Sequence, residues 1–549
     1  MLMKLSKPDQ QWFNRPTTSG EIIAAVAIFI ALFDNTVFFA AAARAFGSSA
    51  SSWPFYISLF VSLAALFVLL LSAVCHRFLI KPILMLVLVL SSVLAYFAHT
   101  YGTVFDTQMV ANALETDRAE AGDLWNPMMI AWIGLLGILP SLAIWRTRLI
   151  FPPWRVETIV RLKLAGFSVV ALVASTVAFG GHYAGLLREH GEVTSAAIPT
   201  YALLSAIRYA ARTAPAAPDP PVAVAPDAAR SLRDAHRELV IMVVGETVRA
   251  DHWGLNGYAR DTTPELRKAG VLNLPDFWSC GTSTAQSVPC MFSNLGHARF
   301  NAGAARTTEN VLDVLSRTGV SVLWRDNNSS SKGVADRLAY QDFKSPKLNP
   351  MCDDQECRDE GMLDGLQSYI DAQSGDILIV LHQMGNHGPA YFKRYPKAFE
   401  RFTPVCRTND LGSCTTEEIH NAYDNAILYT DHFLSKVIAL LKANDDRFET
   451  AMLYASDHGE SLGEYGLYLH GAPYVFAPEA QRHVPAVMWL GAAIKHDVLL
   501  ATLGERSRRR WSHDNVFATL LGLFEIGTGD YRGDMDILEH PAAEMTGFR

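Results

Sequence analysis

Acidic and imidazole side chains follow three apolar runs that lie far apart in the chain. The candidates are Glu246 after residues 239–244, His382 and His387 after residues 377–381, and Asp457 and His458 after residues 450–454, with His470 shortly downstream. Glu, Asp and His are the usual zinc ligands, and a catalytic zinc site keeps one position open for substrate. One such residue alone is more often a cap or a satisfied polar pair, but their recurrence after three runs favours a metal site.

A hydroxyl-rich segment supplies candidates for a nucleophile. Residues 279–290 (SCGTSTAQSVPC) offer five hydroxyls between and beside two cysteines. A hydroxyl next to a bound metal ion has a lowered pKa and can attack phosphorus. A Ser/Thr-rich surface loop explains the same composition equally well, so composition alone leaves both interpretations open.

The apolar runs predict strands that position these residues. Five runs have the length and composition of buried strands, and helical patterns such as 308–317 and 417–442 separate them. This alternation favours an α/β fold with a mainly parallel sheet sandwiched by helices. Ligands bind beyond the carboxyl ends of the strands in such sheets, where the acidic and imidazole residues occur.

The first third of the chain has a different composition. Residues 1–184 contain 21 charged side chains, whereas the other 81 follow, and the later part carries 46 acidic against 35 basic residues within a net charge of −8. An acidic soluble part argues against nucleic acid as a partner, because nucleic-acid affinity comes mainly from Lys and Arg. The composition predicts an all-α membrane domain followed by a soluble domain.

Five apolar stretches are long enough to cross a bilayer as helices. They are residues 22–43, 54–75, 82–99, 124–145 and 164–184. The first is interrupted by Asp34, for which a functional and a structural role are about equally plausible. Most of the basic loop residues fall on one side, which predicts a cytoplasmic N-terminus and an exported second domain.

The boundaries follow from these patterns. We predict a five-helix transmembrane domain at 1–184, a linker at 185–232 with an interfacial helix and a Pro/Ala-rich tether, and a catalytic domain at 233–549. In the loop at 100–123, Asn112, Thr116 and Glu120 would form one polar stripe if that loop were helical. A simple solvated face is the alternative that spacing alone favours.

Six of the seven cysteines form close pairs in the soluble part. The pairs are Cys280/Cys290, Cys352/Cys357 and Cys406/Cys414. An even number of cysteines at short spacing in an exported domain predicts disulfides. Reduced core thiols are the less favoured alternative, and no CxxC pair is present to suggest a zinc site built from cysteine.

Several long blocks resemble the lipid A phosphoethanolamine transferases, which include the polymyxin (colistin) resistance determinants. The blocks include VVGETVRADHWGLNGYARDTTPEL, SCGTSTAQSVPCMFS, WRDNNSSSKGV, LHQMGNHGPAYFKRY and SDHGESLGEYGLYLHG. The resemblance covers nearly the whole chain. It implies five membrane spans and a periplasmic domain of the alkaline phosphatase/sulfatase type in the bacterial inner membrane. It also fits the three disulfides.

The resemblance assigns roles by position. Thr284 matches the family nucleophile, which carries phosphoethanolamine in a covalent intermediate. The zinc ligands would be Glu246, Thr284, Asp457 and His458. His387 and His470 match histidines that bind the transferred phosphate or a second zinc. His382 matches a nearby position without an assigned role. The other residues near the substrate would be Ser329, Lys332, Asn112, Thr116 and Glu120.

The implied reaction moves phosphoethanolamine from phosphatidylethanolamine to lipid A, with one tightly bound Zn²⁺ and the membrane as a partner, and we expect a monomer. Another envelope glycan as acceptor, or a silent lipid-binding module, is the alternative. Sulfatases mature a Cys or Ser in a Cys/Ser-x-Pro-x-Arg motif, and this chain has Met291 where the Arg belongs. Sulfate ester hydrolysis is therefore disfavoured.

Overall fold

The computed structural model describes residues 16–47, 49–116, 118–213, 221–230, 236–353, 356–494 and 500–539. Contacts between Cα atoms divide the chain into two compact units. The helical unit is Met1–Val110 with Trp125–Arg208, and the sheet unit is Ala111–Leu124 with Tyr209–Arg549. Residues 214–220 and 231–235 of the predicted linker lie outside the described residues.

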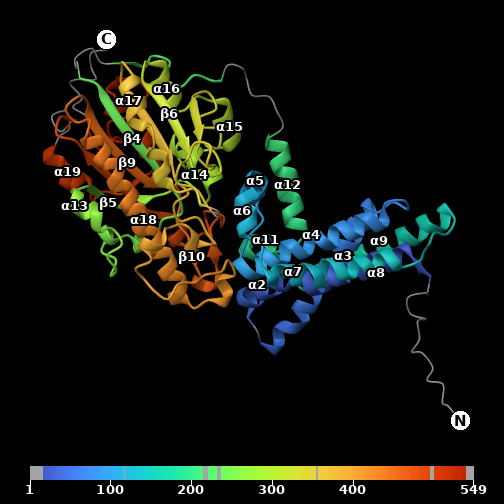
Figure 1. Cartoon of the computed structure of the whole chain (residues 1–549). Coiled ribbons are helices and arrows are strands. Elements are labelled where there is room, and N and C mark those ends of the chain that lie inside the picture. The colour runs from blue at the N-terminus through green and yellow to red at the C-terminus, as the bar shows by residue number, and fades with distance from the viewer. Residues whose placement is uncertain are drawn as a thin grey trace. The chain divides into compact units, whose positions relative to one another are not determined.

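The helical unit contains four helical stretches that are long and apolar enough to cross a membrane (Figure 1). They are Ala50–Val74, Ile80–Tyr101, Pro127–Arg146 and Trp154–Ala178. They correspond to the last four predicted spans, although the last begins ten residues earlier than predicted and ends before α10 (Gly180–Arg188). Many large apolar side chains on these helices are exposed within the structure, as lipid-facing surfaces require.

The first predicted span is a bent pair of helices instead of one straight helix. Residues Ser19–Asp34 (α1 with a terminal π turn) and α2 (Thr36–Phe46) meet at an angle of 59°. The buried Asn35 amide donates to the carbonyls of Ile30 and Ile198 at 3.0 and 2.8 Å and accepts from the Ile198 amide at 2.9 Å. These bonds replace the helical ladder at the bend. Within the described residues there are thus four helices long and apolar enough to cross a membrane, or five if the bent pair counts as one span.

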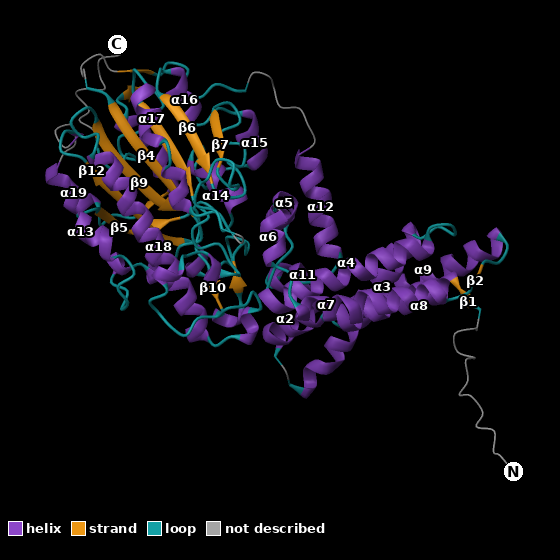
Figure 2. Cartoon of the chain, in the orientation of Figure 1, coloured by secondary structure: helices purple, strands orange, loops and turns teal. Residues whose placement is uncertain are grey.

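The sheet unit is built on eight strands in the order β13-β5-β12-β9-β4-β8-β6-β7 (Figure 2). Five neighbouring strands from β9 to β7 are parallel, whereas β12 is antiparallel to both β9 and β5. The strands are β4 (Glu238–Gly245), β5 (Leu272–Trp278), β6 (Ser321–Asp326), β7 (Ala339–Asp342), β8 (Ile377–His382), β9 (Glu449–Ser456), β12 (His483–Leu490) and β13 (Trp511–Ser512). This mixed sheet confirms the predicted fold class.

Helices cover both faces of this sheet, so the interiors of its central strands β4, β8 and β9 are largely apolar. Residues Leu239–Val244 of β4 are completely buried, as expected for a central parallel strand. One face packs against α14 (Thr284–Met291), α16 (Val311–Arg317) and α20 (Val516–Leu523). The other face packs against α13 (Pro264–Ala269), α17 (Leu366–Ala372) and α18 (Thr416–Lys442). The charged side chains of β4 and β9 and the histidine of β8 therefore lie at the strand ends.

Candidate active site

Four side chains from three distant parts of the chain meet at the carboxyl end of the sheet. The Thr284 hydroxyl oxygen lies 3.3 Å from Glu246 Oε2 and 3.4 Å from His458 Nε2. His458 Nε2 lies 3.3 Å from Asp457 Oδ2 and 3.6 Å from Glu246 Oε1. All four are buried. The structure thus brings together the residues that were predicted as zinc ligands.

Strand register explains this convergence. β4 and β9 are parallel neighbours with Gly245 opposite Ser456, so Glu246 and Asp457 leave the sheet at the same level. The Asp457 amide donates to the Gly245 carbonyl at 2.9 Å, which continues the ladder past the last strand residue. Thr284 is the first residue of α14, so its hydroxyl lies at the N-terminal end of that helix.

A glycine fixes the turn that follows His458. A Cβ atom on Gly459 would lie 1.9 Å from the Ala480 carbonyl oxygen. The Gly459 and Glu460 amides donate to the carbonyls of Gln481 and Ala480 at 3.0 and 2.9 Å. Only glycine permits this close approach of two backbones, so Gly459 holds the turn after His458 in place.

The electrostatics of this cluster fit a bound cation. Burial raises the pKa of the Asp457 carboxyl, and Asp457 Oδ2 accepts no hydrogen bond from the described residues. Burial also lowers the pKa of His458, so its imidazole is neutral. His458 Nδ1 lies 2.9 Å from the Gly459 carbonyl, which can only accept, so Nδ1 carries the proton and Nε2 presents its lone pair to the carboxylates. Two carboxylates, a neutral imidazole and a hydroxyl are a donor set that suits Zn²⁺.

Two further histidines lie beside this cluster. The His470 ring centroid is 4.2 Å from that of His458 and 5.7 Å from that of His387. His470 Nδ1 lies 3.3 Å from Oε2 of the buried Glu460, which orients the ring. His470 thus lies next to His458 of the cluster, and His387 lies next to His470.

His382 belongs to a separate buried pair. Its Nδ1 lies 3.0 Å from Asp326 Oδ2, and the Trp324 indole donates to the same oxygen at 2.8 Å. Burial opposes charge on Asp326, but the neighbouring His382 lowers the pKa of Asp326 below its usual value. His382, at the end of β8, is thus paired with Asp326 of the neighbouring strand β6. The sequence analysis did not single out Asp326.

The segment after β6 contributes Ser329 and Lys332. The Lys332 ammonium lies 3.6 Å from Glu115 Oε2, and the Ser329 hydroxyl donates to Asn328 Oδ1 at 3.0 Å. Asn328 donates in turn to Glu246 Oε2 at 2.6 Å, which links this segment directly to the cluster. Lys332 has a φ of +52°, a strained backbone conformation of the kind that gathers at functional sites.

The predicted polar stripe at residues 112–120 does not lie on one helix. α5 (Thr107–Glu115) ends before Thr116, and α6 (Arg118–Asp123) carries Glu120, whose side chain lies outside the described part. The Thr116 hydroxyl donates to the Asn112 carbonyl at 2.8 Å. The break follows Glu115, whose carboxylate pairs with Arg306 and Lys332, so tertiary ion pairs override the helical pattern there.

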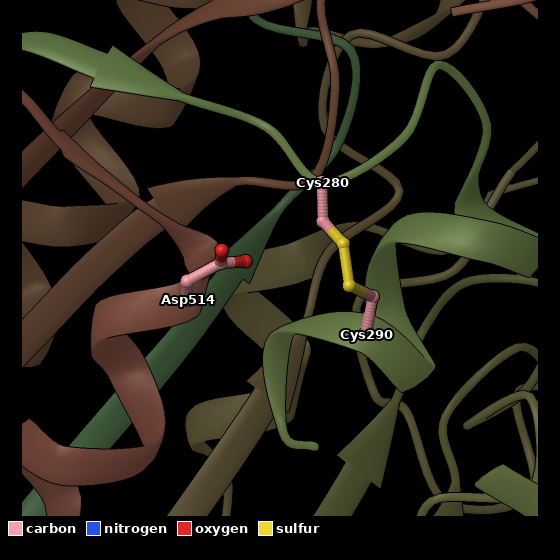
Figure 3. Close-up of side chains that lie close together, drawn as sticks. All are labelled: Cys280, Cys290 and Asp514. Atoms are coloured by element: carbon pink, nitrogen blue, oxygen red, sulfur yellow. A yellow bond between two sulfur atoms is a disulfide. The ribbon is translucent and has the colours of Figure 1, made fainter. Parts of the chain in front are cut away.

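The six predicted cysteines form three disulfides: Cys280–Cys290, Cys352–Cys357 and Cys406–Cys414. Asp514 lies beside the first of them (Figure 3). Both sulfurs there are joined to each other, and Asp514 accepts a hydrogen bond from the His297 amide at 2.8 Å. This group therefore offers no thiolate to a metal ion, whereas Glu246, Asp457 and His458 each offer one ligand atom, and these atoms lie within 4.8 Å of one another.

Sequence reasoning missed several residues that support the site. They are Asp326, Asn328, Glu460 and Arg394, the last of which donates to the His387 carbonyl at 2.6 Å. All four lie inside the motif blocks that carry the family resemblance. Their position in those blocks was the available signal, but their roles depend on contacts between strands.

Comparison with known proteins identifies the family. A model described as phosphoethanolamine transferase EptA/EptB matches residues 63–214, and one described as sulfatase matches residues 238–526. The chain is 43% identical over 533 residues to phosphatidylethanolamine transferase Mcr-2 from Escherichia coli, covering 94% of this chain and 97% of that protein. This chain belongs to the phosphoethanolamine transferase family.

Other members of the phosphoethanolamine transferase family agree in sequence and fold. EptA from Salmonella typhimurium is 40% identical over 452 residues, covering 81% of this chain and 82% of that protein. The solved integral membrane lipooligosaccharide phosphoethanolamine transferase A from Neisseria meningitidis superimposes with a TM-score of 0.91 at 34% identity, covering 95% and 99% of the two chains. The likeness therefore includes both the membrane helices and the sheet unit.

Proposed function

We propose that this protein transfers phosphoethanolamine from phosphatidylethanolamine to a phosphate of lipid A, with Thr284 as the nucleophile. The observation that supports this most directly is the position of the Thr284 hydroxyl within 3.5 Å of both Glu246 and His458 in a buried cluster. Hydroxyl groups attack phosphorus when a neighbouring charge stabilises the oxyanion. Family membership supports the choice of phosphoethanolamine as the transferred group.

The proposed cofactor is one Zn²⁺ held by Glu246, Asp457, His458 and the Thr284 oxygen. When bound, it would lower the pKa of the hydroxyl and stabilise negative charge on the phosphoryl oxygens. The Asp457 oxygen without a hydrogen bond and the Nε2 lone pair of His458 are the groups that would ligate it. His387 and His470 are the residues that would face a second ion, if the enzyme uses two.

The chemistry divides into two steps. The Thr284 hydroxyl would first ionise beside the bound cation and release its proton. Its oxygen attacks the phosphorus of phosphatidylethanolamine, the bond from phosphorus to the diacylglycerol oxygen breaks, and that oxygen takes a proton. A lipid A phosphate oxygen then gives up its proton and attacks the same phosphorus, and the bond to Thr284 breaks, which restores the ionised Thr284 oxygen. His387 or His470 would donate the first proton and accept the second, because imidazole titrates near neutral pH. Lys332 would attract the phosphate through its ammonium group.

The location follows from the two lipid substrates. We propose that the helical unit anchors the enzyme in the bacterial inner membrane with its N-terminus in the cytoplasm and the sheet unit in the periplasm. Anchoring holds the site where both lipids are present, which replaces a search in solution by one in a plane. Asn112, Thr116 and Glu120 would contact the lipid head group. The added ammonium would reduce the negative charge that attracts polymyxins such as colistin.

The test is mass spectrometry of lipid A from cells that express the wild-type chain or Thr284→Ala. We expect lipid A with added phosphoethanolamine only with the wild type, and a phosphoethanolamine adduct on the wild-type peptide that contains Thr284. If lipid A is unmodified and a core sugar or a periplasmic glucan gains the group instead, the acceptor is wrong. If the wild type modifies nothing and hydrolyses no phosphatidylethanolamine, the chain is a binding module.

A further inference from the structure

A buried arginine connects His387 with a distant segment of the chain. Arg394 is 5% exposed along its side chain, and its guanidinium is shared among three acceptors. Its Nε donates to the His387 carbonyl at 2.6 Å, and its two terminal nitrogens reach Asp123 at 2.7 Å and Glu356 at 2.5 Å. All these groups lie within the sheet unit. A planar guanidinium can bind three groups in fixed directions at once, which a lysine cannot do.

Asp123 also accepts hydrogen bonds from residues other than Arg394. Its second carboxylate oxygen accepts from the Lys393 ammonium at 2.5 Å, and its backbone carbonyl accepts from the Asn409 amide at 2.6 Å. The charges of Arg394 and Lys393 lower the pKa of Asp123 below its usual value, although burial opposes this. Asp123 is therefore an ionised, well-paired carboxylate at neutral pH.

Asp123 lies at the end of the segment Ala111–Leu124, which enters the sheet unit from the helical part of the sequence. The other half of this segment is held as well, because Glu115 lies 3.1 Å from Arg306 and 3.6 Å from Lys332. Two carboxylates on a short segment thus face four cationic side chains of the sheet unit. This charge complementarity fixes the segment at both ends.

We infer that Arg394 is a positioning residue for His387. Asp123, which lies on the segment Ala111–Leu124, holds the guanidinium of Arg394 in the direction that this role requires. Arg394 holds the backbone of His387 through its carbonyl, so the direction of the imidazole depends on this bond. Because Asp123 and Glu356 fix the guanidinium from the other side, the docked segment and the histidine are parts of one network. The inference rests on the proposed role of His387 in proton transfer.

Small displacements of a catalytic group have large effects on rate. A shift of about 1 Å in a positioned group can lower a rate by about a hundredfold, since the reacting atoms must remain in a near-attack geometry. A lysine at position 394 would keep the positive charge but would lose the simultaneous bonds to His387, Asp123 and Glu356. We therefore expect the chemical step, rather than substrate binding, to be sensitive to this substitution.

The test is a double-mutant cycle on the purified full-length enzyme with a fluorescent phosphatidylethanolamine. Arg394→Lys in the wild-type background should lower kcat by about tenfold or more while changing KM by less than about twofold. In the His387→Ala background, the same substitution should cost less than about twofold, because a residue that acts through His387 has nothing left to position. Asp123→Asn, which keeps the shape of the side chain, should repeat both results with smaller losses.

Arg407→Lys is the matched control, because Arg407 makes an equivalent pair with Glu400 on an exposed surface and should change neither constant. Folding is checked for each variant by gel filtration and melting temperature. Equal losses from Arg394→Lys in both backgrounds would overturn the inference, since that result describes a general structural role. Full activity of His387→Ala would overturn the inference too, and would show that His387 takes no part in proton transfer. The assignment of Thr284 as the nucleophile would still stand in that case, because only an active Thr284→Ala variant contradicts it.

Discussion

Two aspartates in the same unit of this protein, the partly buried Asp123 and the fully buried Asp457, are satisfied in opposite ways. Asp123 is paired with Lys393 and Arg394 at 2.5 and 2.7 Å, and these charges lower its pKa. Asp457 faces Glu246 and the neutral His458, and burial raises its pKa. The protein supplies its own cations to the first carboxylate but not to the second. Buried carboxylates without a cationic side chain beside them need another positive charge, such as a metal ion, to compensate for their burial. A carboxylate that is paired with Lys and Arg instead holds two segments of the protein together.

The largest expected effect comes from removing the hydroxyl that we propose as the nucleophile. Thr284→Ala should lower turnover of phosphatidylethanolamine by at least about a thousandfold, because the variant lacks the oxygen that we propose bonds to phosphorus. Steady-state kinetics and intact-protein mass measure the turnover and the adduct. Ser283→Ala is the matched control, since Ser283 Oγ makes no hydrogen bond with the described residues. Adduct formation in Thr284→Ala but not in Ser283→Ala would place the nucleophile elsewhere.

Metal removal should lower the melting temperature of the Asp123 variant but not that of the Asp457 variant. A ligand present at a thousand times its Kd stabilises the folded state by about 4 kcal/mol, so a chelator should lower the melting temperature of the wild type clearly. Asp457→Asn should be insensitive to the chelator, whereas Asp123→Asn should respond like the wild type. Thermal melts with and without chelator, and after zinc is restored, measure this. If the chelator shifted the melting temperatures of both variants equally, Asp457 would not differ from Asp123 in metal binding, which contradicts the account.

Neutralising one acid at each place should change the stability of the metal-free protein in opposite directions. Glu246→Gln removes one of the two negative charges that Glu246 and Asp457 bring close together, and should stabilise the metal-free form by about 1 kcal/mol. Asp123→Asn leaves Arg394 short of a partner and should destabilise it by about 2 kcal/mol. Melting temperatures in chelator report both shifts. The comparison fails if both substitutions shift the melting temperature in the same direction.

A third buried acid tests whether a raised pKa alone marks a site. Burial raises the pKa of Asp431 to about 7, and its carboxyl caps α13 by accepting from the Glu265 and Leu266 amides at 2.8 and 2.9 Å. The folded state holds this proton more tightly than the unfolded state, so the stabilising contribution is present at low pH. It is lost as the pH rises from about 4 to about 7, by at most about 1.4 kcal/mol per pH unit.

Asp431→Asn should therefore flatten the dependence of melting temperature on pH in this range while leaving turnover unchanged. Asp431 lies within α18, caps α13 and is not among the proposed ligands, so this effect is confined to stability. Unchanged pH dependence in the variant would show that Asp431 does not hold the proton. A loss of turnover would show that the pKa shift reports a second functional place.

Much of the sheet unit could be predicted because its central strands are continuous apolar runs. The runs ending before Glu246, His382 and Asp457 are β4, β8 and β9, and their order along the sheet places those residues together. The edge elements were missed for physical reasons. β5 contains Pro275 and has only two fully buried positions, Leu274 and Phe277, and β7 is largely exposed, so neither has the composition of a buried strand.

The site was predicted only as far as residue types reveal chemistry. Glu246, Asp457 and His458 stand after strands, but Thr284 was one hydroxyl among five until the family resemblance singled it out. The contacts of Asp326 with His382, and of Arg394 with Asp123, join segments separated by 56 and 271 positions. Such pairs depend on tertiary packing, which leaves no local pattern. The bend at Asn35 is equally hidden, because its partner is Ile198.

The central claim is that Glu246, Asp457 and His458 complete their site with a divalent cation. Elemental analysis of the purified full-length protein tests it most directly, with wild type, Asp457→Asn and Asp123→Asn prepared in parallel. We predict about one zinc per chain in the wild type and in Asp123→Asn, and nearly none in Asp457→Asn. Zinc retained in full by Asp457→Asn, or absent from an active wild-type enzyme, would contradict the account.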